Sequence, residues 1–230
     1  MEEVIEGCYQ RIATIEKSAI AKTVGNMAFH REAKIDGISN GEKIEEIANS
    51  IAEKKNIKNM NETKISLVTV TCETVSMKEV NCCSQKIENE DNNILYIYDM
   101  PIGKAVRASM SFPGLYTTCN YNGYNLIDGG TKNNMQVDVL KKQGADKIIS
   151  VSFDLDSYTP SNNFFDVVIR ALDIFSLENV KKGREKSNVA AIVKTEDTSL
   201  LGIKDTKAVI KAGYDAVMEH KSKILEMLKF

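Results

Sequence analysis

Asp128 and the two glycines after it, Gly129 and Gly130, are the residues best placed to do chemistry. The upstream pair Asn122 and Gly123 predicts a hairpin turn, followed by a short strand that ends at Asp128. The carboxylate would then lie at the carboxyl end of a strand, where ligand sites of open α/β sheets are found. Two glycines leave space around it, so it could act as a general base toward a hydroxyl or a water. From these three residues alone, an ordinary Asp-Gly turn is the favoured interpretation.

Ser39 is a second candidate, because residues 37–41 form a G-x-S-x-G sequence. A nucleophile elbow needs an apolar strand before the serine and a helix of small residues after it. Here the preceding HREAKID is polar and charged, and the following EKIEEIAN is typical of an ordinary amphipathic helix. Ser39 and Glu42 also fit the capping box S-x-x-E that opens a helix. We therefore predict that Ser39 caps a helix and is not a nucleophile.

The chain order Ser39, Asp128, His220 also matches the serine–acid–histidine order of α/β-hydrolases. His220, however, lies within a charged amphipathic segment, where we expect a surface imidazole. We expect the same of His30, the other histidine of the chain. The triad is the weaker alternative.

Composition excludes several other classes of function. The net charge is −2, which argues against nucleic-acid binding, and no apolar run is long enough to span a membrane. We see no signal peptide, no phosphate or dinucleotide loop and no metal-ligand cluster, so we expect a cytoplasmic protein without cofactor or metal. The odd number of cysteines without C-x-x-C spacing predicts free thiols; these are Cys8, Cys72, Cys82, Cys83 and Cys119.

The elements around these residues predict an α/β fold in a single domain, residues 1–230. After Asp128 the chain alternates strand, helix and strand, which indicates a βαβ crossover and a largely parallel sheet. Helical periodicity or composition marks 40–55, 101–112, 135–143, 164–182 and 205–228; strand composition marks 64–73, 93–98, 147–153 (a buried strand) and 188–194.

The segment from 105 to 151 resembles the patatin-like phospholipase family. Members carry a pattern of the type A-x-R-A-S-x-x-x-P-G, followed by D-G-[GA]-x-x-x-N-x-P-V. Gln136 departs from it, since the family usually has proline there. Similarity of this kind runs from roughly residue 36 to 217. The matching residues are Ala105, Arg107, Ala108, Ser109, Pro113, Gly114, Asp128, Gly129, Gly130, Asn134 and Val137.

The resemblance implies a three-layer α/β/α fold with mostly parallel strands, and hydrolysis of lipid acyl esters by a Ser–Asp dyad. Asp128 would be the dyad base, and a glycine-rich loop would supply the oxyanion hole. The family places that loop and its G-x-S-x-G elbow before the segments matched here, and neither occurs in that position. We therefore expect an N-terminally incomplete domain that is inactive alone and that self-associates through an exposed sheet edge. The alternative is a degenerate, non-catalytic fold that binds lipids or a partner.

Overall fold

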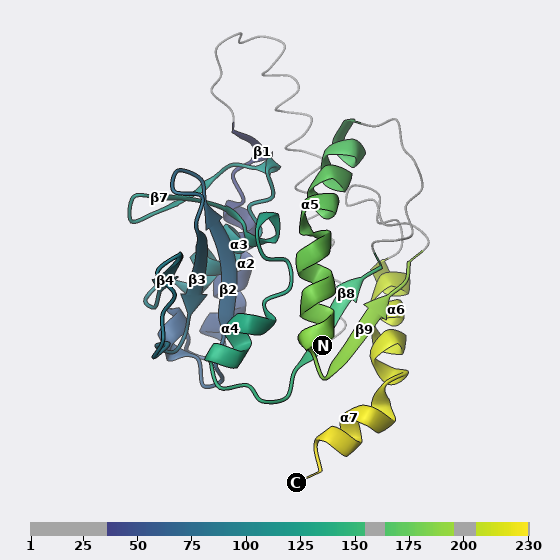
Figure 1. Ribbon diagram of the computed structural model, residues 1–230. Helices are drawn as coiled ribbons and strands as arrows, with labels where there is room; N and C mark the ends of the chain where they lie inside the picture. Colours follow the sequence, from purple (N-terminus) through teal and green to yellow (C-terminus); the bar gives the residue numbers. More distant parts are fainter. Residues whose placement is uncertain (1–35, 155–163, 196–205, 230) are drawn as a thin grey trace. The chain divides into compact units, whose positions relative to one another are not determined.

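The computed structural model describes residues 36–154, 164–195 and 206–229 (Figure 1). These residues fall into two compact units, one ending at Gly130 and the other beginning at Thr131. The single domain over residues 1–230 stays a prediction.

A five-stranded sheet, in the order β4-β3-β2-β7-β6, forms the centre of the first unit. The strands predicted within 64–73 and 93–98 are confirmed as β2 and β4, whereas β3 was not predicted. Strand β3 pairs antiparallel with β2 and parallel with β4. The bounds are β2 Val68–Glu73, β3 Glu79–Cys83, β4 Ile94–Ile97, β6 Cys119–Tyr121 and β7 Tyr124–Asp128.

The hairpin predicted at Asn122 and Gly123 is confirmed. Both residues have positive φ, 47° and 83°, as a tight hairpin turn with the right-handed strand twist requires. The turn joins β6 to β7, which pair antiparallel from Cys119 opposite Leu126 to Tyr121 opposite Tyr124. The turn fixes the register of β6 against β7, and pairing with β2 extends β7 to Asp128.

Two helices stack on one face of this sheet. Helix α3 (Ile102–Ser109) packs on β2 and β7, and helix α2 (Glu42–Glu53) packs on α3. Small residues allow the close approach: Ala105 and Ala108 are fully buried. Strand β1 (Gly37–Ser39) precedes α2 and pairs parallel with β5 (Gly114–Tyr116); the 3-10 turn η1 spans Met60–Glu62. The core comprises Met60, Val80, Cys82, Ile97, Met100, Ala105, Ala108, Cys119 and Leu126.

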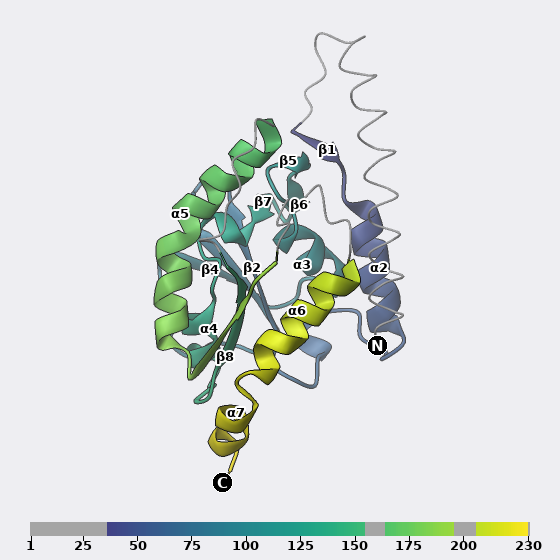
Figure 2. The same cartoon turned by 90° about the vertical axis from the view of Figure 1, so that its right-hand side faces the viewer.

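The second unit contains a pair of parallel strands between helices. Strand β8 (Ile149–Phe153) pairs with β9 (Val189–Val193), and the 3-10 turn η2 (Gly129–Thr131) leads from the first unit into the second. Helix α5 (Phe164–Lys186) contacts both strands, and α6 (Thr206–Met218) packs on β9 (Figures 1 and 2). Two further helices are α4 (Val137–Lys142) and α7 (Lys221–Met227).

The α/β class with helices flanking the sheets is confirmed. The described strand pairings are mixed: β1–β5, β3–β4 and β8–β9 are parallel. Three others, β2–β3, β2–β7 and β6–β7, are antiparallel. Short connections account for two of the antiparallel pairs, β2–β3 and β6–β7, whereas β2 and β7 are far apart in the chain.

Candidate functional site

The backbone around Asp128 is held from two sides. Strand β7 pairs with β2, which places Asp128 opposite Thr71. The Asp128 backbone N–H donates to the carbonyl of Ser111, at 2.9 Å. The Gly130 backbone N–H donates to Oδ1 of Asp128, at 2.7 Å. The backbone position of Asp128 is therefore fixed. One carboxylate oxygen accepts a hydrogen bond from within its own turn, as expected of an Asp-Gly turn.

Burial raises the pKa of the Asp128 carboxyl above its ordinary value of 3.8. The Gly130 N–H stabilises the charged form and offsets part of this effect. A carboxylate that is desolvated in this way holds a proton more strongly than an exposed aspartate. That property suits a group that must accept a proton from a hydroxyl or a water.

Gly129 is required by close packing rather than by its backbone angles. Its α-carbon lies against the backbone of Val70 in β2, so an added Cβ would collide with the Val70 carbonyl. The same carbonyl accepts the Ser109 hydroxyl at 2.9 Å. Helix α3 and the turn after Asp128 thus meet at one point of β2. The predicted motif residues Asp128, Gly129 and Ser109 are brought together there.

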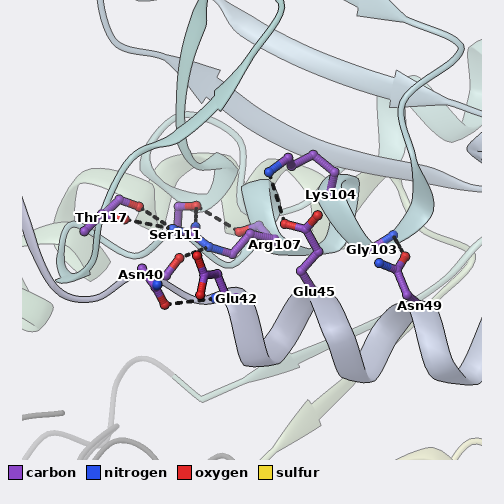
Figure 3. A network of polar contacts seen from close by, with 9 residues as sticks. All are labelled: Asn40, Glu42, Glu45, Asn49, Gly103, Lys104, Arg107, Ser111 and Thr117. Carbon is purple, nitrogen blue, oxygen red and sulfur yellow. Dashed lines mark hydrogen bonds and ion pairs between the residues drawn. The ribbon is translucent and has the colours of Figure 1, made fainter.

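Arg107 lies at the centre of a network of polar contacts (Figure 3). Its side chain is only 3% exposed. Nε donates to the Asn40 carbonyl at 2.7 Å, and Nη2 donates to the Thr117 carbonyl at 2.8 Å and to its hydroxyl at 3.1 Å. Nη1 donates to Ser111 Oγ, and that hydroxyl donates to the Arg107 carbonyl at 2.8 Å.

This network reaches Asp128 through one residue. Ser111, which receives the Arg107 guanidinium on its hydroxyl, is the residue whose carbonyl accepts the Asp128 N–H. The buried guanidinium of Arg107 therefore connects three segments: the turn before α2, the segment after β5 and, through Ser111, the end of β7. The sequence singled out Arg107 only as part of a family pattern. Its partner Asn40 lies 67 residues away in the chain, so no local signal could have identified the whole network.

Ser39 does not cap helix α2, so that prediction is wrong. The residue before the helix is Gly41, in a left-handed conformation with φ 67°, and no side chain caps the helix there. Ser39 Oγ instead accepts the Gly41 N–H at 3.3 Å, and Asn40 Oδ1 accepts the Glu42 N–H at 3.2 Å. The sequence pattern failed because Gly41 turns the chain between the serine and the helix. Arg107 occupies the space that a side chain at residue 41 would need.

His220 lies at a break between helices, not inside one continuous helix. Its N–H donates to the Val217 carbonyl at 3.0 Å, and α7 begins at the next residue. His220 belongs to the second unit and Asp128 to the first. His30, the other candidate imidazole, lies outside the described residues.

The buried cysteines are unsuited to nucleophilic chemistry. Cys72, Cys82, Cys83 and Cys119 are free thiols. Burial raises the pKa of both Cys82 and Cys83 to about 12, so both stay protonated at neutral pH. Within the ranges described, no group of three or more His, Cys, Asp or Glu side chains could hold a metal ion. Nor is any helix of those ranges both long and apolar enough to cross a membrane.

No protein-family model matches the sequence. Over 58 residues the chain is 47% identical to "Lysophospholipase NTE1" of Meyerozyma guilliermondii, 45% to that of Debaryomyces hansenii and 43% to that of Candida albicans. These 58 residues are 25% of this chain and only 4% of each relative's length. The similarity supports a relationship to phospholipases and, through the names of these proteins, to lipid metabolism.

Proposed function

We propose that this chain belongs to a patatin-like lipid acyl hydrolase domain, as its C-terminal part, with Asp128 as the base of a Ser–Asp dyad. The environment of Asp128 carries the proposal. Asp128 ends a strand whose register against β2 is defined, and burial desolvates its carboxylate. The next residue is Gly129, where the backbone of β2 leaves no room for a side chain. The similarity to proteins named lysophospholipases agrees with it and favours a phospholipid or lysophospholipid ester as substrate.

In this mechanism the Asp128 carboxylate takes the proton of the nucleophilic serine as the serine oxygen bonds to the ester carbonyl carbon. The tetrahedral intermediate collapses, the carbon–oxygen bond to the alcohol breaks, and Asp128 returns the proton to that alcohol. In the second half Asp128 takes a proton from water as the water oxygen bonds to the acyl carbon. The bond from that carbon to the serine oxygen then breaks, Asp128 returns the proton to the serine oxygen, and the fatty acid leaves. The raised pKa of Asp128 favours each acceptance of a proton.

The nucleophile in this proposal is not Ser39. Ser39 Oγ already accepts the Gly41 N–H, and its backbone carbonyl accepts the Thr117 N–H at 2.8 Å. In the family that the sequence resembles, the serine and the oxyanion loop precede the segments matched here. We therefore expect the 230-residue chain alone to turn over no ester.

A chimera tests the proposal directly. The nucleophile-bearing N-terminal part of a patatin-like lysophospholipase is fused ahead of this chain, and release of fatty acid from lysophosphatidylcholine is measured. Activity that Asp128→Asn abolishes, while Ser39→Ala retains it, is the expected result. A fluorophosphonate probe on the unfused chain is the companion measurement. Labelling that disappears in Ser39→Ala would show that the chain carries its own nucleophile and that the dyad assignment is wrong.

The second candidate function is a non-catalytic module that binds lipids or associates with itself, and strand β8 favours it. Ile149, Val151 and Phe153 share one face of β8 and are 40%, 52% and 51% exposed, although the sequence predicted a buried strand. Among the described strands β8 pairs only with β9. An apolar edge strand of this kind pairs readily with a second copy.

We propose self-association through β8 and expect a concentration-dependent increase in mass that Val151→Lys reduces. A monomer at all concentrations would rule out this association.

The free thiols further support a reducing, cytoplasmic setting.

A further inference from the structure

We propose that the tip of the β2–β3 hairpin, residues 74–77, is a docking element that inserts into a neutral lipid surface. The tip reads Thr-Val-Ser-Met, and all four residues are exposed. Val75 is 77% exposed and Met77 is 70% exposed. This inference rests on the proposed lipid-hydrolase function, because it concerns how such a domain would reach a lipid substrate.

Met77 adopts a backbone conformation that its side chain disfavours. Its φ is 55°, in the left-handed region. Within the part of the chain that the structure describes, the other two non-glycine residues with positive φ are Asn56 and Asn122, and asparagine tolerates this region well. The hairpin tip therefore carries a bulky apolar residue where asparagine or glycine would relieve strain. Exposure adds a second unfavourable feature, and neither benefits the folded chain by itself.

The tip is held rigid from below. The Glu73 carboxylate, 4% exposed, accepts the Val75 N–H at 3.1 Å, the Ser76 N–H at 2.6 Å and the Ser76 hydroxyl at 2.7 Å. The Thr74 N–H donates to the Asn125 carbonyl at 3.0 Å. Two apolar side chains are thus presented on a preorganised loop, which lowers the entropy lost when they bind.

The size and charge of the tip select a lipid surface over a protein partner. A stable protein interface buries about 800 Å² on each side, far more than two side chains supply, whereas shallow insertion into a bilayer needs only a small apolar contact. No residue of 74–77 is charged, and the neighbouring Lys78 Nζ donates to the Asn92 carbonyl at 3.0 Å. A surface without charge fits zwitterionic lipids and gains nothing from anionic ones.

The position of the tip is compatible with the site. Asp128 lies opposite Thr71 on β2, and Val75 lies four residues further along the chain. At about 3.3 Å per residue this separates them by roughly 13 Å. With Val75 and Met77 at the boundary of the acyl region, a separation of this size would leave Asp128 outside the hydrocarbon layer, on the side of the lipid headgroups.

Flotation of the full chain with vesicles of a phosphatidylcholine diether, which has no ester to hydrolyse, tests the inference. Val75→Ser combined with Met77→Asn should lower the partition coefficient by about tenfold or more. The matched control is Ile65→Ser, which removes an 83%-exposed apolar side chain elsewhere in the same unit and should change partitioning by less than about twofold. Met77→Asn alone should raise the denaturation midpoint, because it relieves the backbone strain at residue 77. A loss of vesicle binding in this variant would therefore not result from misfolding.

A fluorescent reporter gives an independent readout. The chain contains no Trp, so Val75→Trp supplies a single indole whose emission should shift to the blue on vesicles. Two flotation results would overturn the inference: no vesicle binding at all, or an equal loss of binding in the tip variant and in the control variant. In the fluorescence experiment, Trp emission that does not shift when the chain is bound to vesicles would also overturn it. Asp128→Asn should bind as wild type does. A failure of the dyad proposal would therefore appear in the chimera assay and leave this measurement unaffected.

Discussion

Replacing Arg107 with methionine should destabilise the chain more than any other single change in α3. The guanidinium makes four hydrogen bonds, to the Asn40 carbonyl, Ser111 Oγ, and the carbonyl and hydroxyl of Thr117. It also lies 5.9 Å from the ring centroid of Tyr116, within cation–π range. Methionine keeps most of the volume but removes the donors of the part-buried bonds to the Asn40 and Thr117 carbonyls and of the buried bond to Ser111, and an unpaired buried group costs about 1–3 kcal/mol. Part of this is recovered by apolar packing, so the net loss should be about 3–5 kcal/mol.

Urea denaturation of the full chain measures this loss, with Lys104→Met as the matched control. Lys104 lies one turn earlier on α3 and makes a partly exposed ion pair with Glu45, at 3.1 Å, worth about 0–1 kcal/mol. With a slope of about 2 kcal/mol per molar, Arg107→Met should lower the midpoint by about 1.5–2.5 M and Lys104→Met by about 0.5 M or less. Hydrogen exchange at the Asp128 amide should also accelerate in Arg107→Met, because its acceptor is Ser111. Equal midpoints for the two variants would refute the assigned importance of the network.

Four further outcomes follow from the structure. Asp128→Asn should raise the free energy of unfolding at pH 7, because it removes a carboxylate whose pKa burial raises; the gain should vanish below about pH 3.8, where folded and unfolded chains both hold the proton. The pKa of Glu73 is lowered from 4.5 to about 2 by its hydrogen bonds, so Glu73→Gln should cost about 1–2 kcal/mol after solvent screening, and the difference should shrink as the pH falls from 4.5 to 2 in an acid-unfolding series. Gly129→Ala should destabilise by about 1–3 kcal/mol in thermal unfolding through its collision with β2, whereas the control Gly213→Ala, in open space on α6, should stabilise slightly. With a pKa of about 12, the buried thiol of Cys83 should react with a disulfide reagent only as fast as the chain unfolds.

The parts of the site that the sequence predicted are those set by local chemistry. Asn122 and Gly123 tolerate positive φ, so they set the hairpin and the start of β7, and the predicted end of that strand at Asp128 is confirmed. The apolar, β-branched run that became β2 was equally clear. In both cases the neighbours in sequence determine the conformation, and no distant contact competes with them.

The parts that escaped prediction depend on distant contacts. Strand β3 contains Glu79 and Asn81, both buried, which a reading of hydrophobicity alone does not assign to a sheet interior. Ser39 matched a capping box, but Arg107, 67 residues from its acceptor Asn40, fills the space beside Gly41 and sets a different turn. The exposed face of β8 was likewise invisible, because an apolar run does not reveal whether anything covers it.

The energetics of Asp128 bear on the choice between a catalytic domain and a lipid-binding module. Burial raises the pKa of Asp128, which means that the charged form of this carboxylate lowers the stability of the fold. Asparagine would keep the contact with Gly130 without that penalty, and a module that only binds lipid would gain from the exchange. A hydrolase would not, since an amide cannot accept the proton of serine or of water. The same reasoning applies to Met77, whose strain and exposure benefit the chain only when a surface receives it. Under the proposed function, both unfavourable features would lie where a lipid hydrolase needs them: at the proposed base, and at the proposed point of contact with a lipid surface.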